Sequence, residues 1–133
     1  MSNETNRQKL ERFFHAFHYG TIQSELMHPD FLVEEADALP YGGVYRGLRG
    51  CEALARKISA TWSDIEITTQ FILGNENADQ FAAMQRMKGR SRRSGTPFDT
   101  TVFELWSFRD GLITEVRPYY WDTKMMADIG AGK

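Results

Sequence analysis

The spacing of hydrophobic residues separates the chain into a helical first half and a strand-rich second half. In the first half, apolar side chains recur every three or four residues, as along one face of an amphipathic helix. One such stripe consists of Leu10, Phe13, Phe14 and Phe17, and another of Cys51, Leu54, Ala55, Ile58 and Trp62. After Ser63 the period falls to two, the pattern of a half-buried strand. One face of that strand is expected to carry Ile65, Ile67, Thr69, Phe71 and Leu73. Helices first and strands later predict an α+β protein.

Capping and turn residues set the expected ends of these elements. Thr5 and Gln8 have capping-box spacing and Gly20 is a helix stop, so the first helix is expected between them. A short second helix is expected over 21–27, a strand over 31–36, a loop over 37–47 and then a third helix. The later strands are expected over 65–73, 80–90, 98–109 and 112–121, followed by one or two helical turns after Asp122. Asp110-Gly111 is a strong hairpin signal between the last two strands.

The length and element order predict a single domain spanning residues 1–133. Long strands twist and coil. A mainly antiparallel, mixed sheet covered on one face by three N-terminal helices is therefore expected to form a cone that encloses one pocket. Aromatic residues make up 13% of the chain, a bulk that either fills the core or lines such a pocket.

The composition argues against several other classes of protein. Hydrophobic residues account for 41% and charged residues for 26%, which is ordinary for a globular domain. A net charge of −2 gives no general attraction to nucleic acid or to an anionic membrane. The N-terminal residues lack the apolar core of a signal peptide, and no apolar run approaches membrane-spanning length. We therefore expect a cytoplasmic protein that binds neither nucleic acid nor membranes.

Neither a metal nor a cofactor is expected. The single cysteine, Cys51, excludes an intramolecular disulfide and a cysteine-based metal cage. His15 and His18 are three residues apart, but no third ligand has convincing helical spacing with them, so surface histidines are the better interpretation.

Two glutamates are candidate catalytic residues. Glu35 shares strand parity with Phe31 and Val33, and Glu104 shares it with Val102, Trp106 and Phe108. A carboxylate among apolar groups loses hydration, its pKa rises, and it becomes able to move protons near neutral pH. The alternatives are a solvated Glu35 at the start of a loop and a structural salt bridge from Glu104 to Arg86 or Arg117.

Four aromatic residues are candidate ligand-binding residues: Tyr45, Trp62, Trp106 and Tyr120. They could line a pocket with flat apolar walls, although core packing is the alternative for each. The loop over 37–47 is a candidate pocket rim, or a surface crossover without a role. The basic run from Arg86 to Arg93 could bind an anionic ligand or be a solvated hairpin, and the role of Asp122 stays open.

Strands that are apolar on both faces raise the question of oligomeric state. If one face lines the pocket, Phe103 and Leu105 on the other face need cover. Sheet-to-sheet contact in a homodimer would supply it.

Four segments in this order resemble the nuclear-transport-factor-2-like superfamily, and within it the SnoaL-like and ketosteroid-isomerase-like branches. They are the run His28 to Glu35, the Gly43-Val44-Tyr45-Arg46-Gly47 motif, the hairpin Trp106 to Ile113 and the aromatic strand Pro118 to Asp122. The resemblance covers nearly the whole chain and implies the cone-shaped fold. It implies less about activity, because this fold hosts isomerases, cyclases, dehydratases, hydrolases and non-catalytic binders.

The resemblance also suggests roles for individual residues. In steroid isomerases a carboxylate base works with a tyrosine and a protonated acid that form an oxyanion hole. By similarity, Glu35 falls on the base and Glu104 on the acid, whereas Phe13 stands where the tyrosine would be. The last-strand carboxylate of SnoaL-like cyclases falls on Pro118, and only a slip of several residues would reach Asp122.

Two functional hypotheses follow, with a third behind them. The first is a cofactor-free isomerase, cyclase, dehydratase or hydrolase acting on a small apolar or carbonyl-bearing molecule. The second, which the missing hydroxyl favours, is a non-catalytic module that binds or senses such a molecule. The third is an interaction module that uses the sheet face.

Overall fold

The computed structural model describes residues 3–133. Its helices are α1 (Asn6–His18), a short 3₁₀ helix η1 (Ser24–Leu26), α2 (Gly47–Thr61) and α3 (Thr123–Gly130). Its strands are β1 (Met27–Glu35), β2 (Gly43–Arg46), β3 (Trp62–Leu73), β4 (Gln80–Ser91), β5 (Pro97–Arg109) and β6 (Leu112–Tyr120). These elements confirm the α+β prediction.

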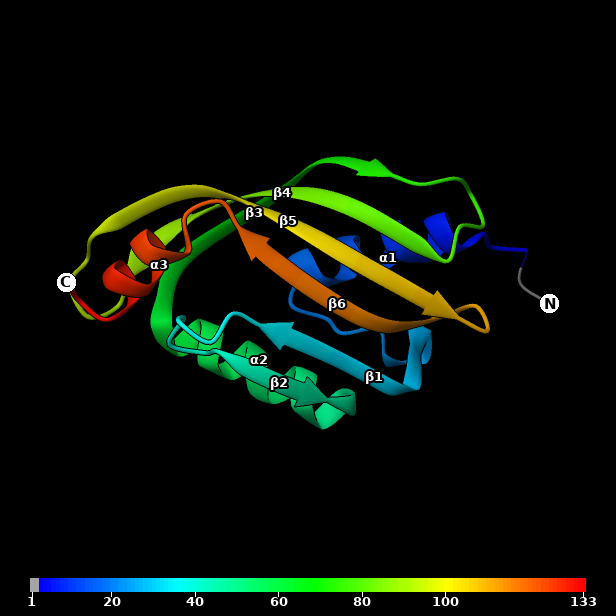
Figure 1. The fold of residues 1–133 in the computed structure, drawn as a ribbon, viewed down its shortest axis with the longest axis horizontal. Coiled ribbons are helices and arrows are strands. Elements are labelled where there is room, and N and C mark those ends of the chain that lie inside the picture. The colour runs from blue at the N-terminus through cyan, green and yellow to red at the C-terminus, as the bar shows by residue number, and fades with distance from the viewer. Residues whose placement is uncertain (1–2) are drawn as a thin grey trace.

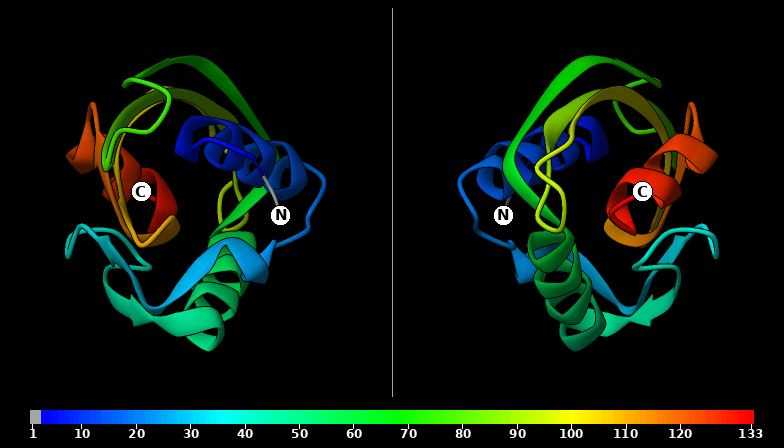
Figure 2. Two further views of the ribbon diagram at one scale, coloured as in Figure 1. Left: turned by 90° about the vertical axis from the view of Figure 1, so that its right-hand side faces the viewer. Right: turned by 90° about the vertical axis from the view of Figure 1, so that its left-hand side faces the viewer.

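The strands form one mixed sheet in the order β2-β1-β6-β5-β4-β3. All neighbouring pairs are antiparallel except β1 and β6, which run parallel. The long strands β3 to β6 run side by side and curve strongly, and the sheet does not close on itself (Figures 1 and 2). Seen end-on in Figure 2, α1, α2 and α3 lie with the curved sheet around one common axis. The predicted cone is therefore confirmed as a fold.

The sheet has an inner face directed at the helices and an outer face directed away from them. Helix α1 begins at the predicted capping box and buries Leu10, Phe13 and Phe14. The Phe13 and Phe14 rings meet the ring of Trp106 on β5 edge-on, at centroid distances of 5.6 and 5.0 Å. Aromatic pairs favour this geometry. The contact fixes α1 against the inner face.

Three boundary predictions in the first half are wrong. The expected helix over 21–27 is only the single turn η1, and β1 already begins at Met27. Part of the expected loop over 37–47 forms β2, which pairs with β1 from Leu32–Arg46 to Glu35–Gly43. Trp62 ends the helical stripe in the sequence, but it is the first residue of β3 and is fully buried. The expected C-terminal helical turns are confirmed as α3.

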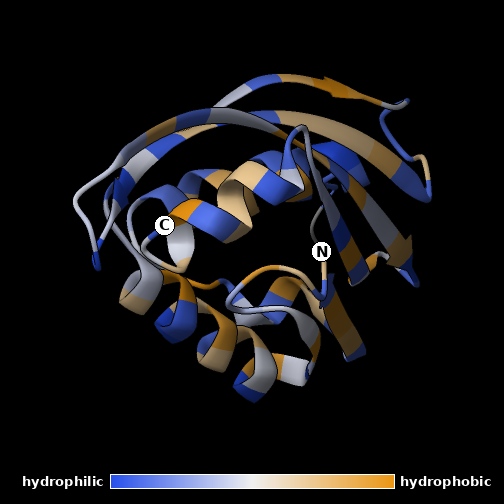
Figure 3. Cartoon of the chain, turned by 60° about the vertical axis from the view of Figure 1, so that its left-hand side comes forward, coloured by the Kyte–Doolittle hydropathy of each residue, from blue (hydrophilic) through white to orange (hydrophobic). Residues whose placement is uncertain are grey.

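The alternation predicted for β3 also breaks. Its register against β4 shifts between Ser63 and Glu66 and again between Thr69 and Phe71. Each such bulge inserts a residue and reverses which side chains point inward. Phe71 and Leu73 therefore lie on the outer face, 44% and 56% exposed, and Ile72 packs against the core instead. Figure 3 shows that hydrophobic residues occur in runs as well as singly along the strands.

Several large apolar side chains remain exposed on the outer face. We call this set the outer apolar patch, and it consists of Phe71, Leu73, Phe103 and Tyr119. Phe103 lies between Met84 of β4 and Tyr119 of β6 in the strand register. None of the helices over residues 3–133 is both long and apolar enough to cross a membrane.

Candidate functional site

Glu35, the last residue of β1, is buried at the inner face. Strand alternation places it on the side of Phe31 and Val33, as predicted, and only 4% of the residue is exposed. Among the described residues its Oε1 has no hydrogen-bond partner. Burial, and to a lesser extent the charge of Glu104, raises the pKa of Glu35 to about 8. The alternative of a solvated glutamate at a loop start is therefore wrong.

Glu104 reaches the same interior from β5. Its Oε1 accepts hydrogen bonds from Gln85 Nε2 at 3.0 Å and Trp106 Nε1 at 3.1 Å. Burial raises its pKa to about 7, and the two hydrogen bonds oppose that rise because they stabilise the ionised form. The predicted alternative of a salt bridge is wrong, because Arg86 pairs with Asp99 and Arg117 with Glu34.

No positive charge offsets this pair of carboxyl groups. The buried polar and charged residues between positions 3 and 133 include no lysine, arginine or histidine. Two nearby carboxyl groups without a cation do not ionise together readily. Near neutral pH the pair therefore holds at least part of one proton, and each carboxyl can accept or release it.

Gln85 holds Glu104 in place and was missed by the sequence analysis. It is 4% exposed on the inner face of β4, and its Oε1 accepts a hydrogen bond from Thr69 Oγ1 at 2.7 Å. Because that bond fixes the amide, its Nε2 is directed at Glu104. The sequence contained one signal for this role. Gln85 is a polar residue that shares strand parity with Ala83 and Met87, both of which are buried.

Two tyrosine hydroxyl groups meet beside the carboxyls. The Tyr41 and Tyr120 hydroxyl oxygens lie 2.7 Å apart, and Trp62 Nε1 donates to the Tyr41 hydroxyl at 3.1 Å. Burial raises the pKa of Tyr41 to about 12. Burial also raises the pKa of Tyr120 well above its usual value, and the charge of Glu35 adds to that rise. Tyr41 is fully buried, although it belongs to a loop in which no periodicity could predict this.

The other predicted aromatic residues have structural contacts. Tyr45 is buried, and its hydroxyl donates to the Tyr41 carbonyl at 2.8 Å, which holds the loop that presents Tyr41. The Lys57 ammonium lies 5.1 Å from the centre of the Tyr45 ring, a cation–π contact. Trp106 combines packing against Phe13 with its hydrogen bond to Glu104.

An open hollow of about 370 Å³ lies where β1 and β6 end and α3 begins. Glu35 and Tyr120 are among its lining residues, together with Asp37 and the ion pair of Glu34 and Arg117. Its volume falls in the range of small-molecule sites. The hollow therefore connects the surface with Glu35, one member of the carboxyl pair, and with Tyr120. The enclosed pocket expected from the sequence stays a prediction.

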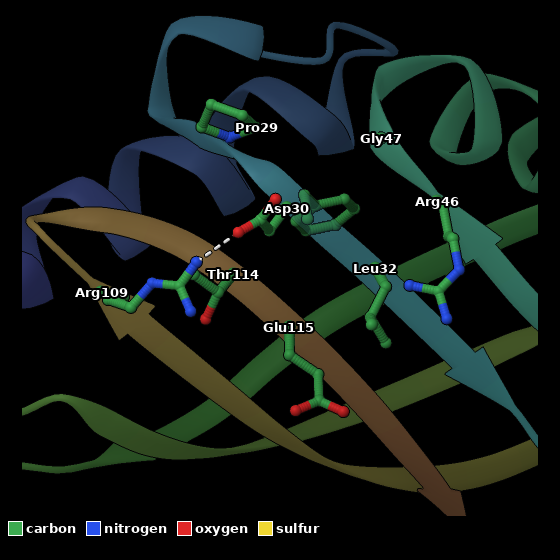
Figure 4. A pocket seen from close by; sticks show the side chains of 9 residues that line it. Pro29, Asp30, Leu32, Arg46, Gly47, Arg109, Thr114 and Glu115 are labelled. Atoms are coloured by element: carbon green, nitrogen blue, oxygen red, sulfur yellow. Dashed lines mark hydrogen bonds and ion pairs between the residues drawn. The ribbon is translucent and has the colours of Figure 1, made fainter.

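A second hollow, of about 460 Å³, lies across β1, β2 and β6 (Figure 4). Asp30 and Arg109 form an ion pair in it at 2.5 Å, and Arg46 and Glu115 also line it. Neither Glu35 nor Glu104 belongs to its lining.

The remaining candidates have ordinary surface contacts. Arg86 binds Asp99 through two hydrogen bonds of 3.0 and 2.7 Å, and Arg90 and Arg92 donate to backbone carbonyls. Asp122 accepts a hydrogen bond from the Met125 amide and caps α3. The His15 ring contacts Tyr19 edge-on. No group of three or more metal-binding side chains occurs in the part of the chain that the structure describes.

Residues 10–116 match the family model of the SnoaL-like domain, which covers most of the chain. The chain belongs to the SnoaL-like family. This membership agrees with the resemblance of its four sequence segments and with the curved sheet. No curated protein matches the sequence.

Solved structures share the fold of this SnoaL-like domain at low sequence identity. An NTF2-like protein from Burkholderia thailandensis E264 superposes with a TM-score of 0.85 and 19% identity, over 95% of this chain and 97% of the other. TerC, co-crystallised with polyporic acid, gives 0.81 and 17%, over 95% and 98% of the two chains. A protein with a ketosteroid-isomerase-like fold from Catenulispora acidiphila DSM 44928, in complex with trimethylamine, gives 0.66 and 17%, over 81% and 84%.

Proposed function

We propose that this SnoaL-like domain catalyses cofactor-free proton transfer on a small, mostly apolar, carbonyl-bearing molecule. The observation that carries the proposal is Glu35, a buried carboxyl whose Oε1 has no partner within residues 3–133 and which borders an open hollow. A buried acceptor without a partner is costly. A ligand in the hollow would relieve that cost.

The chemistry follows from the two carboxyl groups. Ionised Glu35 takes a proton from the carbon next to the carbonyl, so the C–H bond breaks and its electron pair moves toward the carbonyl oxygen. The same proton, or one from Glu104, is then returned at another position. A base with a pKa of about 8 matches this task near neutral pH better than an ordinary glutamate. Isomerisation, cyclisation and dehydration share this step.

Two neighbours in fold support a ligand site. TerC and the Catenulispora protein were solved with polyporic acid and trimethylamine, respectively. Both molecules are small, which supports a small-molecule site in this fold. Because they differ from each other, the ligand of this chain has to be inferred from its own side chains.

Deuterium exchange tests the proposal without knowledge of the true substrate. Small cyclic ketones in D₂O are expected to exchange the hydrogens next to the carbonyl faster with the protein than without it, as followed by NMR. Glu35→Gln is expected to lose this acceleration, and Glu66→Gln, an exposed residue of β3 that does not line the hollow, is expected to keep it. Equal rates for wild type and Glu35→Gln would contradict the proposal.

A non-catalytic binding module is the second candidate. It is favoured by Phe13, which packs on Trp106 and offers no hydroxyl from α1. This candidate predicts that ligand binding survives both Glu35→Gln and Glu104→Gln. It also predicts that neither the wild type nor any variant accelerates deuterium exchange of the ketone.

We further propose that the outer apolar patch is covered by the sheet of a second copy. Exposed apolar side chains in one contiguous set are typical of an interface. Wild type is expected to sediment as a dimer at micromolar concentration, and Phe103→Glu as a monomer. A monomeric wild type would remove this proposal.

A further inference from the structure

The hydroxyl pair contains one more hydrogen than its own contacts use. Tyr41 and Tyr120 carry two hydroxyl hydrogens, and the 2.7 Å contact between their oxygens uses one. Trp62 Nε1 already donates to the Tyr41 oxygen, so it accepts neither of them. One hydrogen is therefore left to donate to a further group.

Burial decides which tyrosine carries that hydrogen. If Tyr120 donated to Tyr41, the free hydrogen would belong to Tyr41, which is fully buried and has no other acceptor among its hydrogen bonds. If Tyr41 donates to Tyr120, the free hydrogen belongs to Tyr120, which lines the hollow. An unsatisfied buried donor costs about 1–3 kcal/mol. The chain of donors therefore runs from Trp62 through Tyr41 to Tyr120, a residue that lines the hollow.

The surroundings strengthen this donor and keep it protonated. A hydroxyl that itself receives a hydrogen bond is polarised and donates more strongly. The acidic interior around Tyr120 also opposes loss of its proton, since burial and the charge of Glu35 raise its pKa. The donor therefore stays intact over the pH range in which Glu35 ionises.

The charge of the interior narrows the ligand class. Arg117 also lines the hollow, but it pairs with Glu34, which offsets its charge. With the two inner carboxyls and no buried cation within residues 3–133, an anionic ligand is repelled. A neutral carbonyl compound avoids this repulsion. Negative charge then develops on its oxygen only when Glu35 removes a proton, and a fixed hydroxyl stabilises it at that moment.

We infer that the Tyr120 hydroxyl, oriented by Tyr41 and Trp62, donates a hydrogen bond to the carbonyl oxygen of a neutral ligand in the hollow between β1 and β6. This inference rests on the proposed function and adds the group that binds oxygen while Glu35 acts on carbon. It also supplies a hydroxyl from β6 in a protein whose α1 has Phe13 directed at the same interior.

Cyclohexanone labelled with ¹³C at the carbonyl is the probe, because one NMR sample reports both halves of the site. A hydrogen bond to the oxygen moves the carbonyl resonance downfield, whereas deuterium exchange at the neighbouring carbons reports proton removal. The wild-type protein is expected to give a saturable downfield shift. Tyr120→Phe is expected to lose that shift and to slow exchange about 100-fold, the usual cost of removing one oxyanion donor. Tyr19→Phe, at an exposed tyrosine that does not line the hollow, is the matched control and is expected to behave as wild type.

The variants separate failure of this inference from failure of the proposed function. A wild-type carbonyl shift in Tyr120→Phe, or no saturable shift in the wild type, overturns the role of Tyr120, while Glu35-dependent exchange would still support proton transfer. Conversely, unchanged exchange in Glu35→Gln overturns proton transfer by Glu35 and leaves the carbonyl contact standing.

A second substitution protects the test against a folding defect. Replacing Tyr120 with 3-fluorotyrosine keeps the ring and the hydroxyl and makes the hydroxyl more acidic. The bound carbonyl resonance is expected to move further downfield, and an unchanged resonance would overturn the inference.

Discussion

Glu34 and Glu35 are neighbours in sequence, but their environments differ in almost every respect. The Glu34 side chain is 44% exposed on the outer face and forms an ion pair with Arg117 at 2.6 Å. Glu35 is 4% exposed on the inner face, and its Oε1 has no partner within the described chain. Alternation along β1 produces the difference, because successive side chains of a strand point to opposite faces. The same carboxyl group is an ion-paired surface charge at one position and a buried group without a partner among the described residues at the next.

The largest expected effect is the pH dependence of proton transfer. In the proposed reaction only ionised Glu35 acts as a base, and burial raises its pKa to about 8. The exchange rate of cyclohexanone is therefore expected to rise about tenfold per pH unit below that value and to level off above it. NMR exchange rates across this range measure it. A wild-type rate that levels off near pH 5, as an ordinary glutamate would give, contradicts the inner-face role. Glu66→Gln, an exposed residue that does not line the hollow, is expected to leave the profile unchanged.

Stability is expected to depend on pH with the opposite sign from that of an ion-paired acid. The unfolded chain releases the Glu35 proton near pH 4.5, whereas the folded protein holds it until about pH 8. Between these values the folded state binds more protons, so the free energy of unfolding falls as pH rises, by an amount on the order of 5 kcal/mol. Urea unfolding at both ends of the range measures the fall. Glu35→Gln is expected to reduce this fall and leave the part that Glu104 contributes below about pH 7, and Glu34→Gln is expected to preserve it. An equal slope in all three proteins would contradict the burial of Glu35.

A smaller effect is expected when Glu104 loses its amide partner. Gln85→Met removes the donor to Glu104 Oε1 and nearly keeps the side-chain volume. Hydrogen bonds to charged groups contribute about 1.5–3 kcal/mol, so the titration midpoint of Glu104 is expected to move up by about one pH unit. A ¹³C NMR titration of the glutamate carboxyls measures it. A midpoint that falls or stays in place would show that Gln85 does not stabilise the ionised form.

The smallest effect is expected at the outer glutamate. Glu34→Gln breaks an ion pair whose two side chains are both 44% exposed, and such pairs contribute about 0–1 kcal/mol. Unfolding in low and high salt measures the loss, which is expected to shrink in high salt because screening weakens the wild-type pair. A loss of several kcal/mol would mean that Glu34 is not a surface charge at all.

Local patterns predicted much of the fold because neighbouring residues determine them. The capping box at Thr5–Gln8, the Asp110-Gly111 hairpin and the change from helical to strand periodicity all correspond to observed elements. The prediction of a second helix over 21–27 was wrong because seven residues are too few for helical propensity to outweigh strand pairing. Met27 pairs with Ile113 of β6 instead. The predicted inward direction of Phe71 and Leu73 was wrong because a bulge between Thr69 and Phe71 reverses which side chains of β3 point inward. Simple alternation does not anticipate a bulge.

The sequence by itself determined the two carboxyl groups of the candidate site. The parity of Glu35 with Phe31 and Val33, and of Glu104 with Trp106, holds along one strand and requires no knowledge of its neighbours. Only the tertiary structure decided what surrounds them. Tyr41 comes from a loop, Gln85 from β4 and Tyr120 from the end of β6, and their contacts with Trp62, Glu104 and each other depend on how distant segments pack. Side-chain direction is a local property of the backbone, whereas a hydrogen-bond partner is a property of the whole fold.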